Sequence, residues 1–541
     1  MIISSVSQGL LWGILGLGIY LTFRILKFPD MTTEGSFPLG GAVCVTLMNQ
    51  GVNPILATIL GMLSGMLAGF VTGLLYTKGK IPTILAGILV MTSCHSIMLM
   101  VMKRANLGLN EIQTLKDFLP FSNDLNLLVL GLIAILLVIS ALIYFLYTRL
   151  GQAYIATGDN PDMAKSFGID TDKMEMLGLI VSNGLIALSG ALVSQQDGYA
   201  DVSKGIGVIV IGLASIIIGE VLYSTGLTLF ERLIAIVVGS ILYQFLITAV
   251  IALGFNTNYL KLFSAIVLGI CTYGSCPKNE DFERSTLIMV MKIIELKEAT
   301  VQVSNGLAEM KTILDHVNLS IYEHDFITIL GGNGAGKSTL FNVIAGTLML
   351  SGGNIYIMGQ DVTNLPAEKR AKYLSRVFQD PKMGTAPRMT VAENLLVAKF
   401  RGEKRPLVPR KITNYTEEFQ KLIARTGNGL DRHLETPTGL LSGGQRQALS
   451  LLMATLKKPN LLLLDEHTAA LDPRTSVSLM GLTDEFIKQD SLTALMITHH
   501  MEDALKYGNR ILVMKDGKIV RDLNQAQKNK MAIADYYQLF D

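Results

Sequence analysis

The stretch TILGGNGAGKSTLFNVIAGTL, residues 328–348, carries the clearest chemistry in the chain. Residues 331–338 follow the pattern G-x-x-x-x-G-K-S. Glycines in such a loop let backbone N–H groups surround phosphate oxygens, and the following helix points its positive N-terminal end at the same charge. Lys337 is placed to neutralise β- and γ-phosphate oxygens, and Ser338 offers a hydroxyl to Mg²⁺. The stretch predicts a strand, a phosphate-binding loop and a helix.

A second stretch, LLLLDEH at 461–467, is an apolar strand that ends in two carboxylates. We predict that Asp465 is a Mg²⁺ ligand, either directly or through water, and that Glu466 polarises an attacking water molecule. The alternative is a strand end that merely faces solvent, but the glycine loop in the same chain favours the catalytic interpretation.

The stretch LSGGQRQALSLLMATL, residues 441–456, places a serine and two glycines before an amphipathic helix, which suits phosphate binding. LSGGQ resembles the signature of the ATP-binding cassette (ABC) transporter family, and the resemblance covers about residues 291–523. It implies an α/β P-loop ATPase domain with a helical subdomain, which uses ATP and Mg²⁺. The nucleotide contacts implied are Gly331, Asn333, Gly334, Ala335, Gly336, Lys337, Ser338, Thr339, Ser442, Gly443, Gly444 and Gln445.

Three further motifs carry the same resemblance. Gln379 in VFQDP resembles the glutamine that touches Mg²⁺ and faces the membrane domain, and AALD at 469–472 resembles the D-loop. His499 in MITHHMEDA resembles the switch histidine at the γ-phosphate, with His500 as the alternative. The implied catalytic residues are Glu466, His499 and Gln379. The implied metal ligands are Ser338, Gln379 and Asp465.

Two positions depart from the family pattern. The aromatic residue that stacks on adenine is replaced by Val303, so base stacking is absent or supplied elsewhere. His467 follows Glu466 where many members carry proline, and we expect a local variant of the turn rather than a second polar contact in the site.

The two halves of the chain differ in composition. The 541 residues predict more than one domain, and the mean hydropathy of +0.42 favours a membrane protein. Residues 1–288 hold 15 Lys and Arg and 17 Asp and Glu, whereas residues 289–541 hold 31 and 27. The near-neutral balance gives no indication of nucleic-acid binding. We expect a permease at 1–277, a linker at 278–290 and an ATPase at 291–541.

An all-α polytopic membrane domain of eight or nine segments is predicted, because a spanning helix needs about 20 apolar residues. The expected spans are 5–27, 54–77, 81–102, 126–148, 174–196, 206–223, 229–253 and 260–275. The stretch 37–50 is too short to cross alone and requires protein or water around it. The first span lacks a basic leader and a cleavage site, so we expect it to be retained. Basic residues beside the spans place the N-terminus outside and the ATPase in the cytoplasm.

A few membrane-half features invite interpretation. The glycines of GMLSGMLAGFVTG, residues 61–73, predict close helix packing. Glu220 is the clearest ionisable residue within an apolar run, and we favour a structural hydrogen bond over a role with the solute. The four cysteines lack the spacing of a zinc site and are expected to be packing residues.

The loop 149–170 combines turn signals with a short helical stretch that carries Ala, Met and Phe. We predict a short helix that docks into a partner domain beside Gln379, and the alternative is an interfacial connector without a partner. In the family such a loop is the coupling helix.

The resemblance also implies partners. In the family the glycine loop of one cassette faces the LSGGQ of another, so one of each cannot form two complete sites. We expect two copies of this chain, or this chain and a homologue, to form the working unit, and one membrane half per cassette fits a homodimer. The membrane half is similar to the branched-chain amino acid and ribose permease class, and more closely to tryptophan/tyrosine-type uptake systems, through MTTEGSFPLGGAV (31–43) and LASIIIGEVL (213–222). This implies that the chain imports a small solute across the bacterial cytoplasmic membrane, and that an extracytoplasmic solute-binding protein delivers the solute. The implied solute is an aromatic amino acid, and tryptophan is the first candidate. The rivals are an exporter of lipid or drug, and a membrane ATPase that moves no solute.

Overall fold

The chain divides into two units, and each is described by itself. The computed structural model describes residues 2–109, 112–222, 228–252, 289–304, 310–332 and 334–529. The first unit comprises residues 1–158, 172–278 and 407–409, and the second comprises 159–171, 279–406 and 410–541. Residues 159–171, which lie between two helices of the first unit in sequence, thus belong by their contacts to the second unit.

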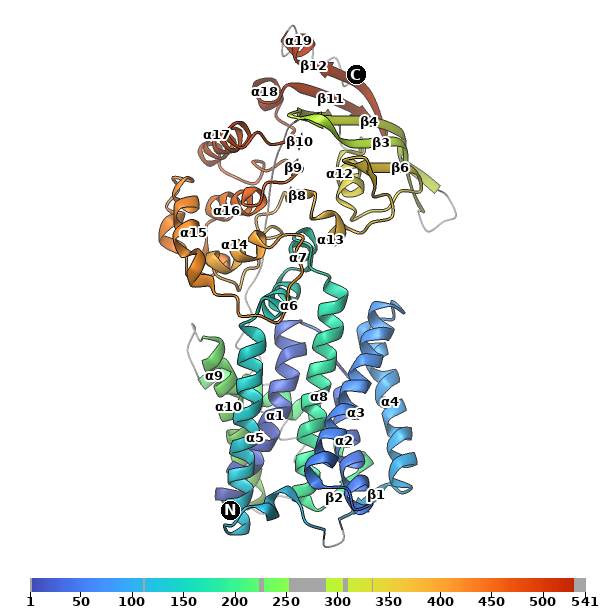
Figure 1. Cartoon of the computed structure of the whole chain (residues 1–541), viewed down its shortest axis with the longest axis vertical. Coiled ribbons are helices and arrows are strands. Elements are labelled where there is room, and N and C mark those ends of the chain that lie inside the picture. The colour runs from blue at the N-terminus through green and yellow to red at the C-terminus, as the bar shows by residue number, and fades with distance from the viewer. Residues whose placement is uncertain are drawn as a thin grey trace. The chain divides into compact units, whose positions relative to one another are not determined.

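The first unit is helical (Figure 1). Its elements are α1 (Ile2–Ile19), η1 (Tyr20–Ile25), α2 (Thr33–Asn49), α3 (Pro54–Thr77), α4 (Thr83–Met102), β1 (Asn106–Gly108), η2 (Leu115–Phe118), α5 (Asn123–Leu146), α6 (Arg149–Asp159), α8 (Thr171–Asp197), β2 (Tyr199–Asp201), η3 (Val202–Gly205), α9 (Val208–Leu222) and α10 (Leu229–Ala252). The part of the chain that the structure describes contains seven helical stretches long and apolar enough to cross a membrane. They match seven of the expected spans, and the eighth, 260–275, lies outside the described residues.

The short stretch predicted at 37–50 is the C-terminal part of α2, a helix of 17 residues that begins four residues earlier than expected. Most of its side chains are buried, and the Phe37 ring stacks on Trp12 of α1 with ring centroids 5.0 Å apart. A Cβ on Gly40 would lie 2.1 Å from the carbonyl oxygen of Ala187 on α8. Protein therefore surrounds α2, as the sequence argument required.

The glycines of α3 form a stripe that packs against α8. Gly61, Gly65, Gly69 and Gly73 recur every four residues, so they share one helix face. A Cβ on Gly69 would lie 2.2 Å from the carbonyl oxygen of Leu179. The predicted role of this run, close helix packing, is confirmed.

Polar contacts join helices within the first unit. Arg24 Nε donates to Glu220 Oε1 at 2.8 Å, which confirms the structural interpretation of Glu220. The buried carboxylate of Asp30 accepts from Thr32 N at 2.9 Å and from Asn183 Nδ2 at 2.7 Å. Asp30 thereby ties the start of α2 to α8. Cys44 and Cys94 are free and buried, as expected of packing residues, and the other two cysteines lie outside the described residues.

The second unit is an α/β domain. Its strands are β3 (Met289–Ser304), β4 (Met310–Glu323), β5 (Phe326–Gly331), β6 (Gly352–Ile357), β7 (Gln360–Asp361), β8 (Leu374–Val377), β9 (Leu461–Asp465), β10 (Ala494–Ile497), β11 (Arg510–Lys515) and β12 (Lys518–Asn524). Its helices are α7 (Pro161–Ser166), α12 (Lys337–Ala345), α13 (Ala367–Arg370), α14 (Val391–Lys399), η5 (Ile412–Tyr415), α15 (Thr416–Ala424), η6 (Leu430–His433), η7 (Thr438–Leu440), α16 (Gly443–Thr455), α17 (Pro473–Gln489), α18 (Met501–Lys506) and α19 (Gln525–Lys528). The first strand begins at Met289, two residues before the expected start of the ATPase.

Two sheets organise the second unit. The six-stranded sheet has the order β12-β11-β5-β10-β9-β8, with only β12 antiparallel to its neighbour. The four-stranded antiparallel sheet has the order β4-β3-β6-β7. The central strands β5, β9 and β10 are completely buried, which is why each reads as a continuous apolar run rather than an alternating one.

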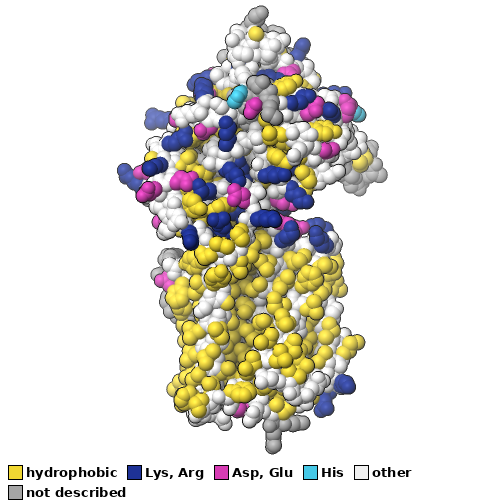
Figure 2. Space-filling model, viewed as in Figure 1, with side chains coloured by type: hydrophobic (Ala, Val, Ile, Leu, Met, Phe, Trp, Pro, Cys, Tyr) yellow, Lys and Arg dark blue, Asp and Glu magenta, His cyan; other side chains and the backbone are white. Residues whose placement is uncertain are grey.

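The surfaces of the units reflect their compositions. Figure 2 shows hydrophobic side chains over most of the visible face of the first unit, and charged side chains distributed over that of the second. Exposed large apolar residues such as Leu67, Met100 and Leu137 lie on helices of the first unit. A surface of this kind suits a lipid environment.

The glycine stripe makes a stability prediction. Gly69→Ala inserts a methyl group against the α8 backbone, and overpacking of this kind costs about 1–3 kcal/mol. We expect a lower midpoint of thermal unfolding of the full chain in detergent. Gly13→Ala on α1 is the matched control, because its Cβ would meet neighbours at an ordinary 3.6 Å. Equal midpoints for the two variants would contradict the packing of α3 on α8.

Candidate nucleotide site and docking segment

The predicted catalytic residues come together because of the sheet order. Strands β5, β10, β9 and β8 are adjacent and parallel. The glycine loop, His499, Glu466 and Gln379 each follow the carboxyl end of one of these strands. Parallel strands end at the same edge of a sheet, which is where open α/β sheets bind ligands. The sheet therefore gathers residues that lie far apart in sequence.

The glycine loop has the backbone that phosphate binding requires. Gly334 and Gly336 adopt φ values of +83° and +94°, which favour residues without a Cβ. Helix α12 begins directly at Lys337, so its first N–H groups face the loop. Ala335 is buried, Ser338 is exposed on the first turn and Thr339 is half-buried. Asn333 lies outside the described residues.

Lys337 is buried against its own loop. Its Nζ donates to the carbonyl oxygens of Gly331 at 2.7 Å and Gly332 at 3.0 Å. Burial lowers the pKa of the ammonium group, and the nearby Glu466 carboxylate opposes that effect. A phosphate group would favour the charged form more strongly, because it places negative charge at contact distance.

Glu466 stands in an unusual backbone conformation. Its φ is +62°, in the left-handed region, which costs a residue with a side chain about 1–3 kcal/mol. Two hydrogen bonds hold it there, from Glu466 N to Ile497 O at 2.9 Å and from Ala469 N to Glu466 O at 2.8 Å. The side chain of Glu466 is only 13% exposed in this conformation.

The side chain of Glu466 unites the three predicted catalytic residues. Gln379 Nε2 donates to Glu466 Oε2 at 3.1 Å, and His499 Nε2 forms an ion-pair contact with Glu466 Oε1. This geometry places His499 at the carboxylate. It does not do so for His500, whose backbone N–H donates to Thr498 Oγ1 at 3.0 Å before α18 begins.

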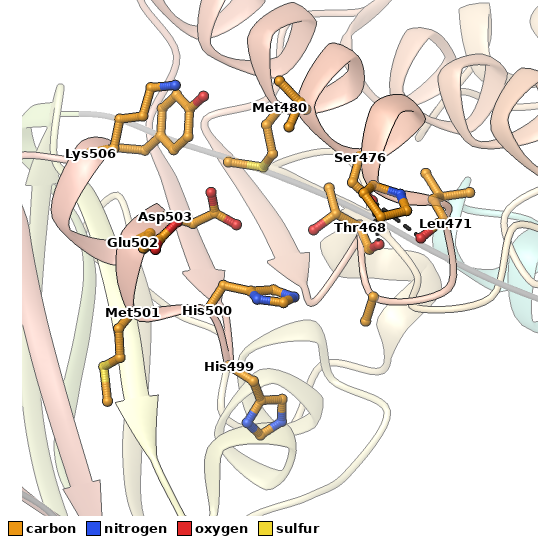
Figure 3. A pocket seen from close by; sticks show the side chains of 14 residues that line it. Thr468, Leu471, Ser476, Met480, His499, His500, Met501, Glu502, Asp503 and Lys506 are labelled. Carbon is orange, nitrogen blue, oxygen red and sulfur yellow. Dashed lines mark hydrogen bonds between the residues drawn. The ribbon is translucent and has the colours of Figure 1, made fainter. Parts of the chain in front are cut away.

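A cavity of about 770 Å³ lies beside this cluster, between the segment 468–480 and α18. Figure 3 shows His500 and Asp503 on one side of it and Thr468 and Ser476 on the other. His499 and residues of the predicted D-loop also line it. The cavity therefore separates His499 from the start of α17.

Arg376 is a site residue that sequence reasoning missed. Its Nη2 lies 3.4 Å from Asp465 Oδ2, and its Nη1 donates to Asn342 Oδ1 at 2.7 Å. Its guanidinium also lies 5.1 Å from the centre of the Phe378 ring. Arg376 thus positions the carboxylate predicted to bind Mg²⁺. The sequence contained one signal for this residue, namely a charged side chain within the otherwise apolar strand LSRV.

The signature segment begins α16 with a capping box. The Ser442 hydroxyl accepts from Gln445 N at 3.3 Å, and Gln445 Oε1 accepts from Ser442 N at 3.2 Å. A Cβ on Gly444 would lie 2.6 Å from Thr475 Cγ2, so this position packs tightly on α17. Among the described residues, no hydrogen bond joins 442–445 to 331–339 of the same chain.

The segment 159–171 is bound within the second unit. Asp159 has a completely buried carboxylate. It accepts from Arg388 N at 2.7 Å and pairs with Arg388 Nε. Asn160 Nδ2 donates to the carbonyl oxygens of Lys382 at 2.7 Å and Thr385 at 3.0 Å. These acceptors follow Gln379 by three to six residues in sequence, so the predicted docking of a short helix beside Gln379 is confirmed.

Apolar and backbone contacts complete the docking. Met163, Ala164, Phe167 and Ile169 are buried, and Gly402 N donates to Phe167 O at 3.2 Å. The buried Arg446 of α16 donates to Thr385 Oγ1 at 2.6 Å. The acceptor loop is therefore bound by the docked segment on one side and by the signature helix on the other.

The two departures from the family pattern have different outcomes. His467 is buried, and its Nε2 lies 3.2 Å from Thr483 Oγ1 of α17, while its carbonyl oxygen accepts from Gln447 at 3.1 Å. His467 thus joins α16 to α17. Val303 is an exposed residue on β3.

A glycine-loop α/β domain with a signature helix, in one chain with several membrane-competent helices, defines a transporter of the ABC class. The sequence model described as "Branched-chain amino acid transport system / permease component" matches residues 1–272, and that described as "ABC transporter" matches residues 314–469. The chain belongs to the branched-chain amino acid transport system permease family and carries an ABC ATPase in the same polypeptide.

Both halves have similar curated relatives. A tyrosine transport system permease protein of Clostridioides difficile is 40% identical over 297 residues, which cover 55% of this chain and 98% of that protein. A tyrosine transport ATP-binding protein of the same organism is 38% identical over 249 residues, 46% of this chain and 99% of that protein. The spermidine/putrescine import ATP-binding protein PotA of Haemophilus ducreyi is 36% identical over 230 residues, 42% of this chain and 57% of its own length.

The chain is therefore a multi-pass membrane protein with a cytoplasmic ATPase, which binds ATP and couples its hydrolysis to transport.

The position of Glu466 predicts the effect of removing its charge. Glu466→Gln keeps the side chain's size but cannot accept a proton, so we expect ATP turnover to fall at least about 100-fold. Binding of ATP should persist, because the glycine loop is intact. Measurement of phosphate release and of bound ATP tests this. Glu502→Gln, at an exposed position of α18, is the matched control. Substantial turnover by Glu466→Gln would show that another group activates water.

Proposed function

We propose that this chain is the permease and ATPase of a bacterial importer that takes up an aromatic amino acid. A solute-binding protein outside the cytoplasmic membrane would deliver the solute. One observation carries the proposal: the two halves match the permease and the ATP-binding protein of a tyrosine transport system over almost the full length of each. The sequence alone favoured tryptophan, and the names of the relatives add tyrosine as a candidate.

The geometry supports specific roles at the nucleotide. Lys337 and the glycine loop would hold the phosphates of ATP, Glu466 would polarise the attacking water, and His499 would contact the γ-phosphate. Gln379 and His499 already converge on the Glu466 carboxylate. These contacts would orient the Glu466 carboxylate, and they would change when its surroundings change. Such behaviour suits Gln379 and His499 as residues that sense the state of the nucleotide.

The donor set also fits Mg²⁺. Ser338, Asp465 and Gln379 offer a hydroxyl, a carboxylate and an amide oxygen, the hard donors that Mg²⁺ prefers. The described residues contain no group of three or more His, Cys, Asp or Glu side chains that could hold a metal. That arrangement suits an ion that takes most of its ligands from phosphate and water. When bound, Mg²⁺ would neutralise charge on the phosphate oxygens.

Two copies of the chain would form the working unit. Ser442, Gly443, Gly444 and Gln445 make no hydrogen bond to the glycine loop within the described part of one chain. We infer that they serve the glycine loop of the partner copy, where the N-terminus of α16 would face phosphate. One permease and one ATPase per chain then give a symmetric homodimer with two composite sites.

The join between the halves would fix their ratio. We propose a permease at 1–277 and an ATPase that begins with β3 at Met289, so that a linker of about ten residues joins them. A short covalent link raises the local concentration of each half at the other. The docked segment 159–171 would then carry movement between them.

Reconstituted uptake tests the proposal. The full chain is reconstituted in proteoliposomes, and ATP is supplied on the side that the ATPase faces. In the presence of the solute-binding protein, the proteoliposomes should accumulate labelled L-tyrosine or L-tryptophan. Uptake should require both the binding protein and Glu466. If the chain takes up another amino acid and does not take up an aromatic one, the assigned solute is wrong. Stimulation of ATP turnover by lipids or drugs without the binding protein would indicate an exporter, and ATP turnover without any flux would indicate a mechanical role.

A further inference from the structure

A cavity of about 410 Å³ lies within the second unit, between α7 and the ATPase core. Helix α7 lines one side, the end of α12 another, and β8 with Phe378 a third. Its volume lies in the range of about 300–1,000 Å³ that small-molecule sites occupy. It is separate from the cavity beside His499, with which it shares no lining residue.

Three charged side chains line the cavity: Asp162, Lys165 and Arg376. Arg376 is engaged by Asn342 and Asp465. Asp162 and Lys165 are three residues apart on α7, so they lie on one helix face. Within the described part of the chain, neither side chain makes a hydrogen bond or an ion pair. One carboxylate and one ammonium group are therefore available to an occupant.

The rest of the lining is mainly apolar. Phe378 and Leu374 are buried, and Leu348, Met383 and Ala345 add aliphatic surface. A lining of this kind favours an occupant with a flat apolar group, and the two charges on α7 complement an ammonium and a carboxylate on the same molecule. A free aromatic amino acid has all three features.

We propose that this cavity binds a free aromatic α-amino acid and that the bound molecule slows ATP turnover. Lys165 would pair with the ligand's carboxylate and Asp162 with its ammonium group, while the ring would pack against Phe378. The proposal rests on the proposed function only for the source of the ligand. The imported amino acid would reach the cytoplasmic face and would there act as a signal of sufficient supply.

The path from the cavity to the catalytic cluster is short. Arg376 forms part of the wall and lies 3.4 Å from Asp465. Arg376 also donates to Asn342 of α12, the helix that begins with Lys337. An occupant that joins α7 to this wall would hold Arg376 on Asp465 and on α12. A ligand shifts a protein toward the state that it binds better, so any rearrangement of α12 or Asp465 around ATP would then be opposed.

ATP turnover of the full chain in lipid nanodiscs, without the solute-binding protein, tests the inference. L-Tyrosine should lower turnover about fivefold, within the usual range of allosteric coupling. Three probes each lack one recognised group: tyramine lacks the carboxylate, 3-(4-hydroxyphenyl)propionate lacks the amine, and L-alanine lacks the ring. Each should have a much weaker effect than L-tyrosine.

Two variants locate the effect. Lys165→Ala and Asp162→Asn should each abolish inhibition, read as the ratio of turnover without and with L-tyrosine, so that changes in basal turnover cancel. They should also abolish calorimetric binding of L-tyrosine at this site. Lys369→Ala, an exposed residue on α13 outside the cavity lining, is the matched control and should be inhibited like the parent chain. Equal inhibition of all variants, or no inhibition of the parent chain, would overturn the proposal.

The outcome separates this inference from the proposed function. If proteoliposomes accumulate L-tyrosine but turnover is not inhibited through Lys165 and Asp162, the inference is wrong and the importer stands. If inhibition depends on both residues but no aromatic amino acid is taken up, the cavity stands and the assigned solute is wrong.

Discussion

The buried carboxylate of Asp159 is the contact that holds the segment between α6 and α8 within the second unit. A carboxylate removed from water costs several kcal/mol unless it is paired and hydrogen-bonded. Arg388 supplies both its backbone N–H and its guanidinium to Asp159. The segment between α6 and α8 is thereby held within the ATPase unit. The apolar residues of α7 and of the following turn are buried there.

One loop receives this contact and leads directly to the chemistry. Residues 379–388 begin with Gln379, which donates to Glu466, and end with Arg388, which holds Asp159. Between them, Thr385 accepts from Asn160 through its carbonyl oxygen and from Arg446 through its hydroxyl. A displacement of the docked segment would therefore reach Glu466 and α16 through this loop. This continuity supports the proposed role of the segment in coupling.

Local sequence patterns predicted most of the fold, and the motifs supplied the residues that we propose for catalysis. Apolar runs located seven of the helices, and the glycine repeat in α3 predicted its close packing on α8. The resemblance assigned Gln379, Glu466 and His499 to one site, but local patterns did not predict their contacts, because Gln379 and His499 lie 120 positions apart. The parallel sheet order brings them together, and strand order is a long-range property that local patterns do not encode.

Other features depended on the tertiary structure for the same reason. Arg376 could be noticed as a charge in a buried strand, but its partner Asp465 is 89 residues away. His467 stood out as a departure from the family pattern, yet its role as a contact to Thr483 became visible only when α17 was placed beside it. The short helix α2 was predicted with the wrong start, because its first turn contains polar residues that are buried and hydrogen-bonded rather than exposed.

The role of Asp159 in coupling can be measured as the ratio of solute taken up to ATP hydrolysed by Asp159→Asn in proteoliposomes. Neutralising the buried carboxylate should weaken the docking, so uptake should fall about tenfold or more while ATP turnover stays within about twofold, a loss in the usual range of coupling between sites. Asp172→Asn, an exposed carboxylate at the start of α8, should leave the ratio unchanged. An unchanged ratio in Asp159→Asn would contradict the account.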